Sequence, residues 1–256
     1  MEYGLRFEKR VGMFVTETDC FQVNQFIWWA INSNTYVVCE KNSLLIVDPV
    51  DSEEFYQFVQ KQTVQNALVI LTHSHYDHIS GLNRLRQIVP DTCVVASKIC
   101  SDNIQTPKKN LSNIADAIIS FQSRIDHKAE LEELKETLVQ PFSCAPADKT
   151  FETELELEWE GHSLCLSEFS GHSKDSVCCI MDNKYMFSGD TLLPIPTVTR
   201  LPGGSTARFW EEDMPKLERL QEQISMVFPG HEMPGTLKDM LVVNLKSARY
   251  SRLNNE

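Results

Sequence analysis

A dense cluster of metal-binding side chains directly follows an apolar run, residues 67–71, that is typical of a buried strand. The cluster holds three imidazoles and one carboxylate in six residues, His73-Ser74-His75-Tyr76-Asp77-His78. In an extended segment the first two histidines point to the same side, because side chains alternate along a strand. A helical pattern follows, which places Asp77 and His78 in a first helical turn, where the dipole favours a carboxylate and a neutral imidazole. Four such side chains are hard to explain as packing, so we interpret them as a metal site rather than a solvated turn.

Three more ligand-type residues share one local pattern, in which an apolar run ends in a tight glycine-containing turn. They are His172 after Phe169-Ser170-Gly171, Asp190 after Phe187-Ser188-Gly189, and His231 after Val227-Phe228-Pro229-Gly230. Residues at strand ends are held on a rigid scaffold, as a metal site requires. His127 lies in an amphipathic helical pattern and His162 in a Glu-Gly-His-Ser turn, so we interpret both as surface or structural residues.

Strand-like and helix-like segments alternate through both halves of the chain, without an internal repeat or a low-complexity linker. A hairpin is expected over residues 34–47, where two β-branched-rich runs flank residues 40–42. Further strands are expected at 92–96, 155–159, 163–169, 176–181, 185–187 and 225–228, and helices from Asp51, over 79–88 and 214–224, and from Thr236. The pattern predicts a single layered α/β domain over residues 1–256. Phe26, Trp28 and Trp29 are interpreted as core or sheet packing rather than a substrate platform.

Residues 106–140 form an inserted helical element in this expected domain. Apolar residues recur there every three or four positions, and no glycine or proline occurs between Pro107 and Pro141. This insert would cap the active site, make a homodimer contact, or form a passive pair of surface helices.

The net charge of the chain limits the classes of molecule that it is expected to bind. The chain has 24 Lys+Arg and 36 Asp+Glu, a net charge of −12. This excess argues against binding to nucleic acid or to an anionic membrane, since both need clustered basic residues. No apolar run approaches the roughly twenty residues of a membrane span. A small-molecule partner is therefore expected.

The N-terminus and the cysteines indicate a cytoplasmic protein. The first eleven residues carry several charges and no apolar segment, so no secretory signal is expected. Without a secretory signal, the eight cysteines are expected to be reduced thiols rather than disulfides. They contain no CxxC pair, which argues against a structural cysteine zinc site.

Taken in order, the motifs resemble those of the metallo-β-lactamase-fold hydrolase superfamily, most closely its glyoxalase II-like branch. They are His73-x-His75-x-Asp77-His78, Gly171-His172, Ser188-Gly189-Asp190 and Gly230-His231. Asn34-Thr35-Tyr36 and the strand that ends at Asp48 match that branch too, so the resemblance covers residues 34–234. It implies a four-layer αββα sandwich with metals at one edge, between two sheets.

The resemblance also implies a role for each matching residue. His73, His75 and His172 would bind the first metal ion. Asp77, His78 and His231 would bind the second, Asp190 would bridge the two, and Asp48 would orient a ligand imidazole by a hydrogen bond. A set of five histidines and two aspartates contains no thiolate, so it suits two divalent ions, with zinc favoured and iron or manganese also accepted.

The function implied is that of a dinuclear metallohydrolase, in which a metal-bridging hydroxide attacks a small thioester, ester or lactone. Asp77 would also pass a proton to the leaving group. The expected lack of a secretory signal argues against a periplasmic lactamase, and the acidic charge argues against the RNA-processing branch. Because only a short stretch follows His231, we do not expect the C-terminal helical domain of glyoxalase II.

Three alternative functions remain open on the same fold. One is phosphodiester hydrolysis. Another is a mononuclear iron dioxygenase of the persulfide-oxidising type, for which His73, His172 and Asp190 would suffice. The third is a metal-dependent ligand sensor without turnover.

A proline- and glycine-rich loop, residues 194–204, directly follows Asp190. Thr197, Thr199 and Arg200 in this loop are candidates for substrate contact. Arg200 would pair with a carboxylate or phosphate of the substrate, or with a surface carboxylate of the protein itself.

Overall fold

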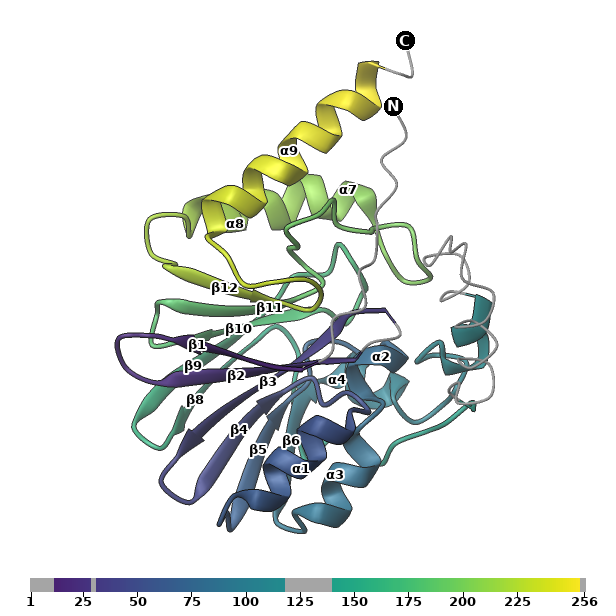
Figure 1. Ribbon diagram of the computed structural model, residues 1–256. Helices are drawn as coiled ribbons and strands as arrows, with labels where there is room; N and C mark the ends of the chain where they lie inside the picture. Colours follow the sequence, from purple (N-terminus) through teal and green to yellow (C-terminus); the bar gives the residue numbers. More distant parts are fainter. Residues whose placement is uncertain (1–11, 29–30, 118–139, 254–256) are drawn as a thin grey trace.

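Two β-sheets form the two inner layers of the molecule (Figure 1). The computed structural model describes residues 12–28, 31–117 and 140–253. In these residues the larger sheet has seven strands, in the order β1-β2-β3-β4-β5-β6-β7, and the smaller has five, in the order β12-β11-β10-β9-β8. The larger sheet comprises β1 (Met13–Glu17), β2 (Gln22–Trp28), β3 (Ser33–Glu40), β4 (Ser43–Val47), β5 (Asn66–Ile70), β6 (Thr92–Ser97) and β7 (Lys149–Phe151). The smaller comprises β8 (Glu154–Trp159), β9 (His162–Glu168), β10 (Val177–Met181), β11 (Tyr185–Gly189) and β12 (Met226–Pro229).

Helices cover the outer face of each sheet (Figure 1). On the larger sheet they are α1 (Glu53–Lys61) and α3 (Leu82–Ile88), and on the smaller sheet α8 (Met214–Arg219) and α9 (Leu237–Leu253). Shorter elements lie in the connections: α2 (Tyr76–Ile79), α4 (Lys98–Asn103), the 3₁₀ turn η1 (Ser112–Ile114), α7 (Thr206–Arg208) and the π-helical turn η2 (Phe209–Asp213). The described helices are all too short or too polar to cross a lipid bilayer.

Strand β4 shows how the sequence produces the layers. Its residues are all buried, because both faces of the sheet are covered. Leu44 and Ile46 pack against the helices outside, whereas Leu45 and Val47 face the space between the sheets. The expected α/β fold, an αββα sandwich, is confirmed.

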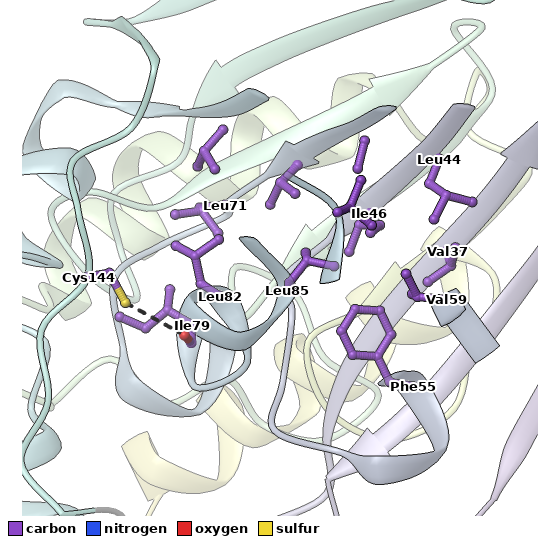
Figure 2. Packing of buried hydrophobic residues seen from close by; sticks show 14 of the residues in the cluster. Val37, Leu44, Ile46, Phe55, Val59, Leu71, Ile79, Leu82, Leu85 and Cys144 are labelled. Carbon is purple, nitrogen blue, oxygen red and sulfur yellow. Dashed lines mark hydrogen bonds between the residues drawn. The ribbon is translucent and has the colours of Figure 1, made fainter. Parts of the chain in front are cut away.

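The outer layer of the larger sheet is a dense apolar cluster (Figure 2). Leu82 and Leu85 of α3 and Phe55 of α1 are fully buried there against strand residues such as Ile46. Truncating one of these leucines to alanine would cost about 2–5 kcal/mol. Since α3 follows the histidine cluster directly, this packing fixes the helix that continues from the cluster.

The hairpin over residues 34–47 is confirmed as the antiparallel pair β3 and β4, with Val37 opposite Ile46. Strands β1, β2 and β7 were not expected. In β2, the polar residues Asn24 and Gln25 are buried, which hides the usual apolar alternation. Trp28 ends this strand and packs edge-on against Tyr76, as expected of a packing residue, while Trp29 lies outside the described residues.

Some boundaries differ from expectation. Helix α1 is capped by Ser52, whose Oγ accepts from the Phe55 amide, rather than by Asp51. The expected helix over 79–88 is interrupted, because the chain turns at Ser80–Gly81 between α2 and α3. The expected helix at 214–224 ends at Arg219.

Most of the helical insert at about 106–140 lies outside the described residues, as does His127. Its described beginning forms η1 (Ser112–Ile114). His162 opens β9, where its Nδ1 lies 2.6 Å from Asp182 Oδ2. All eight cysteines are free thiols, as expected.

Candidate metal centre

The seven candidate ligands come together from connections that follow four different strands. His73, His75, Asp77 and His78 follow β5, His172 follows β9, Asp190 follows β11 and His231 follows β12. Among the described residues, three sets have potential ligand atoms that lie within 4.8 Å of one another. One of them, Asp48 with His73 and His78, contains the carboxylate that bonds to His78 Nδ1, and the other two contain only candidate ligands. We call them the His73 group (His73, His75 and His172) and the His231 group (Asp77, His78 and His231).

Asp190 lies between the two groups. Its Oδ2 is 3.6 Å from His172 Nε2 in the His73 group and 3.3 Å from His231 Nε2 in the His231 group. Its Oδ1 is 3.4 Å from His78 Nε2. One buried carboxylate therefore contacts both groups, as a bridging ligand would.

Two of the imidazoles are oriented by backbone carbonyls. His172 Nδ1 lies 2.6 Å from the Val198 carbonyl oxygen, and His231 Nδ1 lies 3.0 Å from that of Ile31. A carbonyl oxygen only accepts, so each Nδ1 carries a hydrogen, and in the neutral imidazole each Nε2 keeps its lone pair for the centre. Neither Val198 nor Ile31 could be predicted from the sequence, because the contact is made by the backbone.

Asp48 orients two more imidazoles, one directly and one through Thr72. His78 Nδ1 donates to Asp48 Oδ2 at 3.0 Å. Thr72 donates from Oγ1 to the same carboxylate at 2.5 Å, so its oxygen is left to accept from His73 Nδ1 at 3.1 Å. Asp48 has a φ of 51°, an uncommon left-handed conformation that is typical of residues constrained at functional sites. Thr72 was missed by sequence reasoning, although it directly precedes the cluster.

His75 is oriented differently from the other histidines. Its Nδ1 lies 3.1 Å from His172 Nε2, so both nitrogens aim at one point. Two neutral imidazoles with lone pairs directed at each other repel unless a proton or a cation lies between them.

The buried polar atoms without a hydrogen-bond partner show whether these candidate ligands fit metal ions. Among the described residues, His73 Nε2, His78 Nε2 and Asp190 Oδ1 are buried without a hydrogen-bond partner. Unpaired buried polar atoms are costly, and these three belong to the His73 group, the His231 group and the carboxylate between them. Imidazole nitrogens and carboxylate oxygens suit zinc, iron and manganese, so the residues present fit divalent metals.

Burial keeps the His73 group neutral. It lowers the pKa of His73 well below its usual range, with help from the neighbouring His78 and His75. Burial and the adjacent His172 lower the pKa of His75 to about 4, and burial also lowers the pKa of His172. Neutral imidazoles are the form that binds metals.

The acidic residues have the opposite effect on the His231 group. Burial would lower the pKa values of His78 and His231, but Asp77 and Asp190 outweigh it and raise both. Burial likewise opposes ionisation of Asp190, yet His231, His78 and His172 hold the pKa of its carboxyl well below its usual range. The carboxylates of Asp77 and Asp190 thus favour positive charge on the neighbouring imidazoles, a charge that a divalent cation would supply in place of protons.

The turn that carries His231 is held by the larger sheet. Asn34 donates from its backbone N to the Gly230 carbonyl at 2.8 Å and from Nδ2 to the Pro229 carbonyl at 2.9 Å. Tyr36 donates its hydroxyl to the same Pro229 carbonyl at 2.8 Å. The Asn34-Thr35-Tyr36 motif thus has a structural role, which is to fix this turn against the opposite sheet.

The loop over residues 194–204 is anchored by α9. Asn244 on this helix accepts from the Thr197 backbone N at 2.9 Å and donates to the Leu193 carbonyl at 3.2 Å. The next residue, Val198, supplies the carbonyl that orients His172. Arg200 is exposed on this loop.

The other two substrate candidates make contacts within the protein. Thr197 Oγ1 contacts the Thr191 carbonyl at 3.4 Å, and Thr199 Oγ1 contacts Thr206 Oγ1 at 2.7 Å.

Comparison with known sequences identifies related proteins. A family model described as the metallo-beta-lactamase superfamily matches residues 28–231. A hydroxyacylglutathione hydrolase of Francisella philomiragia is 31% identical over 72 residues, which cover 27% of this chain and 29% of that protein. The chain thus spans less than a third of that relative's length. A hydroxyacylglutathione hydrolase of Glaesserella parasuis is 22% identical over 204 residues, 79% of this chain and 67% of that protein.

Solved structures share the fold. The BLEG-1 B3 metallo-beta-lactamase superposes with a TM-score of 0.66 at 23% identity, covering 87% of this chain and 97% of that one. TTHA1623 in a di-iron-bound form gives 0.61 at 21% identity, covering 86% and 98%. ETHE1 from Myxococcus xanthus gives 0.58 at 19% identity, covering 87% and 82%. At these identities the likeness concerns the fold alone.

Proposed function

This chain belongs to the metallo-beta-lactamase superfamily, and we propose that it is a dinuclear metal-dependent hydrolase of small thioesters, esters or lactones. The observation that carries the proposal is the position of Asp190, in contact with both the His73 group and the His231 group. A mononuclear iron dioxygenase would need only His73, His172 and Asp190. The gathered Asp77, His78 and His231 therefore favour hydrolysis with two ions.

Different residues of the chain have different roles in the proposed mechanism. The His73 group would hold one ion and the His231 group the other, with Asp190 shared between them. When bound, two such ions supply Lewis acidity and lower the pKa of water toward neutrality. Asp48 and the carbonyls of Val198 and Ile31 keep the imidazoles in the tautomer that leaves Nε2 free.

Asp77 would move the proton in this mechanism. Its Oδ2 lies 3.3 Å from His78 Nε2 and 3.4 Å from His231 Nε2. Burial opposes its ionisation, but these imidazoles prevail and lower its pKa, so Asp77 is a carboxylate at neutral pH. A carboxylate in this place would accept a proton from the nucleophile and return it to the leaving group.

The substrate proposal is a small thioester or ester. It is supported by the hydroxyacylglutathione hydrolases among the relatives. Arg200, exposed on the loop after Asp190, would bind a substrate carboxylate, and Thr197 is the second proposed substrate contact on this loop. Zinc is the proposed metal, while the di-iron state of TTHA1623 makes iron the second choice. A cytoplasmic location, a lack of nucleic-acid and membrane partners, and a homodimer contact through the insert stay predictions.

The test is metal analysis together with a substrate panel. We expect the purified protein to hold close to two ions and to hydrolyse a thioester from the panel. His75→Ala and Asp190→Ala should each lose metal and lower hydrolysis by orders of magnitude. His162→Ala is the matched control, because this histidine contacts Asp182 and belongs to neither group. Stoichiometric metal and full hydrolysis surviving in both site variants would overturn the proposal.

The same panel separates the alternatives. Oxygen consumption with glutathione persulfide would identify a dioxygenase, and turnover limited to phosphodiesters would identify a phosphodiesterase. Tight ligand binding without turnover of any substrate would identify a sensor.

A further inference from the structure

Asp175 is a buried carboxylate beside the His73 group, and neither the motifs nor the proposed mechanism gives it a role. It lies three residues after His172, just before β10, and is 3% exposed. A buried carboxylate is retained only where hydrogen bonds compensate its desolvation. The Asp175 carboxylate has such partners on two segments of the chain, and its backbone has a partner on a third.

The first partner lies inside the histidine cluster. Asp175 Oδ2 accepts from the backbone N of Ser74 at 2.9 Å. Ser74 stands between His73 and His75, so this bond fixes the peptide from which both imidazoles project. Without the carboxylate, a buried backbone N–H would have no acceptor, and the segment would be free to rotate.

The second partner lies beside His172. Asp175 Oδ1 accepts from Ser173 Oγ at 2.8 Å, and Ser173 directly follows that histidine. One carboxylate therefore ties the peptide between His73 and His75 to the turn that holds His172.

The third partner anchors Asp175 itself. Ser97 donates from Oγ to the Asp175 carbonyl at 3.0 Å, and the same Oγ caps α4 by accepting from the Cys100 amide. The backbone of Asp175 is thus held by the end of β6, outside both ligand-bearing segments. Because its backbone is held independently of the ligand-bearing segments, the Asp175 carboxylate can fix the positions of the residues that bond to it.

We propose that Asp175 is a positioning residue for the His73 group, which sets the relative placement of His73, His75 and His172 through Ser74 and Ser173. This inference rests on the proposed metal centre. It differs from the role of Asp48, which bonds to an imidazole directly, because Asp175 acts on the backbone that carries the ligands.

The experiment measures zinc affinity of the apoprotein by competition with a chromophoric chelator. The His231→Ala background leaves the His73 group to be measured alone. In that background we expect Asp175→Ala to weaken zinc binding about 10–100-fold, the usual effect of losing an outer partner of the ligands. In a His172→Ala background, where the His73 group is already broken, Asp175→Ala should change the affinity by about twofold or less.

Two further variants distinguish positioning from general destabilisation. Asp175→Asn keeps an acceptor oxygen for Ser74, and its amide can donate to Ser173 Oγ, so it should recover most of the affinity. Asp182→Ala is the matched control, because Asp182 also accepts a backbone N–H, from Ser163 at 3.0 Å, and its other contact is with His162, which is not a candidate ligand. It should leave zinc affinity unchanged.

The outcomes separate this inference from the function. A wild-type protein that binds no stoichiometric zinc overturns the proposed function. A wild-type protein that binds two ions, with unchanged affinity in the folded Asp175→Ala variant, overturns the inference alone. If Asp175→Ala does not fold, Asp175→Glu decides, since it keeps the charge but moves the oxygens by one methylene. Unchanged affinity in a folded Asp175→Glu protein would also overturn the inference.

Discussion

Single residues in this protein show how burial and charge are balanced. Asp48, Asp77 and Asp190 are all at most 7% exposed, close to buried imidazoles. Isolated buried carboxylates would be severely destabilising. Asp48 accepts hydrogens from His78 Nδ1 and Thr72 Oγ1. Asp77 and Asp190 lie beside His78 and His231, whose pKa values they raise. The compensation is incomplete at Asp190 Oδ1, which lacks a hydrogen-bond partner among the described residues. That atom is where a cation would stabilise the protein most directly.

Asp213, which is not a candidate ligand, allows a pH prediction. Burial raises the pKa of Asp213 to about 6, although the Gly171 N–H and Lys216 act against the rise. Because the folded pKa exceeds the usual value of 3.8, folding takes up a proton between about pH 4 and 6. The stability from this group is thus present below pH 4 and lost as the pH rises toward 6.

At neutral pH the buried Asp213 carboxylate is ionised, which destabilises the folded state. Asp213→Asn should remove this destabilisation, since an amide carries no charge and its oxygen still accepts from the Gly171 N–H. We expect its melting temperature to exceed that of the wild type at pH 7.5, with a smaller difference at pH 4. Thermal unfolding at the two pH values checks this, with the exposed Glu218→Gln on α8 as the control for loss of one charge. A difference independent of pH would contradict the assignment.

At the scale of elements, the positions of the candidate ligands depend on how closely the turns after β11 and β12 approach each other. Gly230 donates its backbone N to the Gly189 carbonyl at 2.8 Å. A Cβ at Gly230 would overlap Asp190 Oδ1 and lie 2.8 Å from His78 Cε1. Only glycine permits this approach, because it has no side chain.

Gly230→Ala should therefore displace Asp190 and His78. We expect a destabilisation of about 1–3 kcal/mol from overpacking and a loss of about 100-fold in kcat/KM from misplaced groups. Metal content, thermal unfolding and hydrolysis measure these effects. Gly235→Ala, in the same connection, is the control, since its Cβ would meet only Met240 Cε at 3.4 Å. Wild-type metal content and rate in Gly230→Ala would refute the close-approach argument.

At the scale of the whole molecule, the candidate ligands join the two sheets. His73, His75, Asp77 and His78 extend from β5 of the larger sheet, whereas His172, Asp190 and His231 extend from strands of the smaller one. Ions held there would link both sheets in the folded state and would find no such site in the unfolded chain.

Removing the metal should therefore lower the stability of the whole protein. Each ion at 100 times its Kd adds about 2.7 kcal/mol, so a chelator should lower Tm by several degrees and added zinc should restore it. Calorimetry with and without chelator measures the shift, and Asp190→Ala should show a smaller one. Identical thermograms for the metal-loaded wild type in both conditions would exclude a structural role for the metal.

The sequence by itself determined the local features. The order of apolar runs and turns predicted most of the strands, and the spacing in His73-Ser74-His75-Tyr76-Asp77-His78 predicted a metal site. Both features can be predicted from the sequence, because side-chain periodicity and glycine turns depend on neighbours along the chain. Strand β2 was missed, since its polar Asn24 and Gln25 are buried by distant partners rather than by anything local.

Only the tertiary structure decided which residues support the site. Asp175, Thr72 and the carbonyls of Val198 and Ile31 orient the candidate ligands from other segments of the chain. A backbone carbonyl has the same chemistry in every residue, so the sequence does not indicate which carbonyl will orient a ligand. The sequence around a single aspartate likewise does not indicate which group will bond to it. Their roles arise when the two sheets pack and bring residues 31, 74, 175 and 198 to one end of the sandwich. The physical reason is that hydrogen bonds depend on distance in space, which the order of residues specifies only through the complete fold.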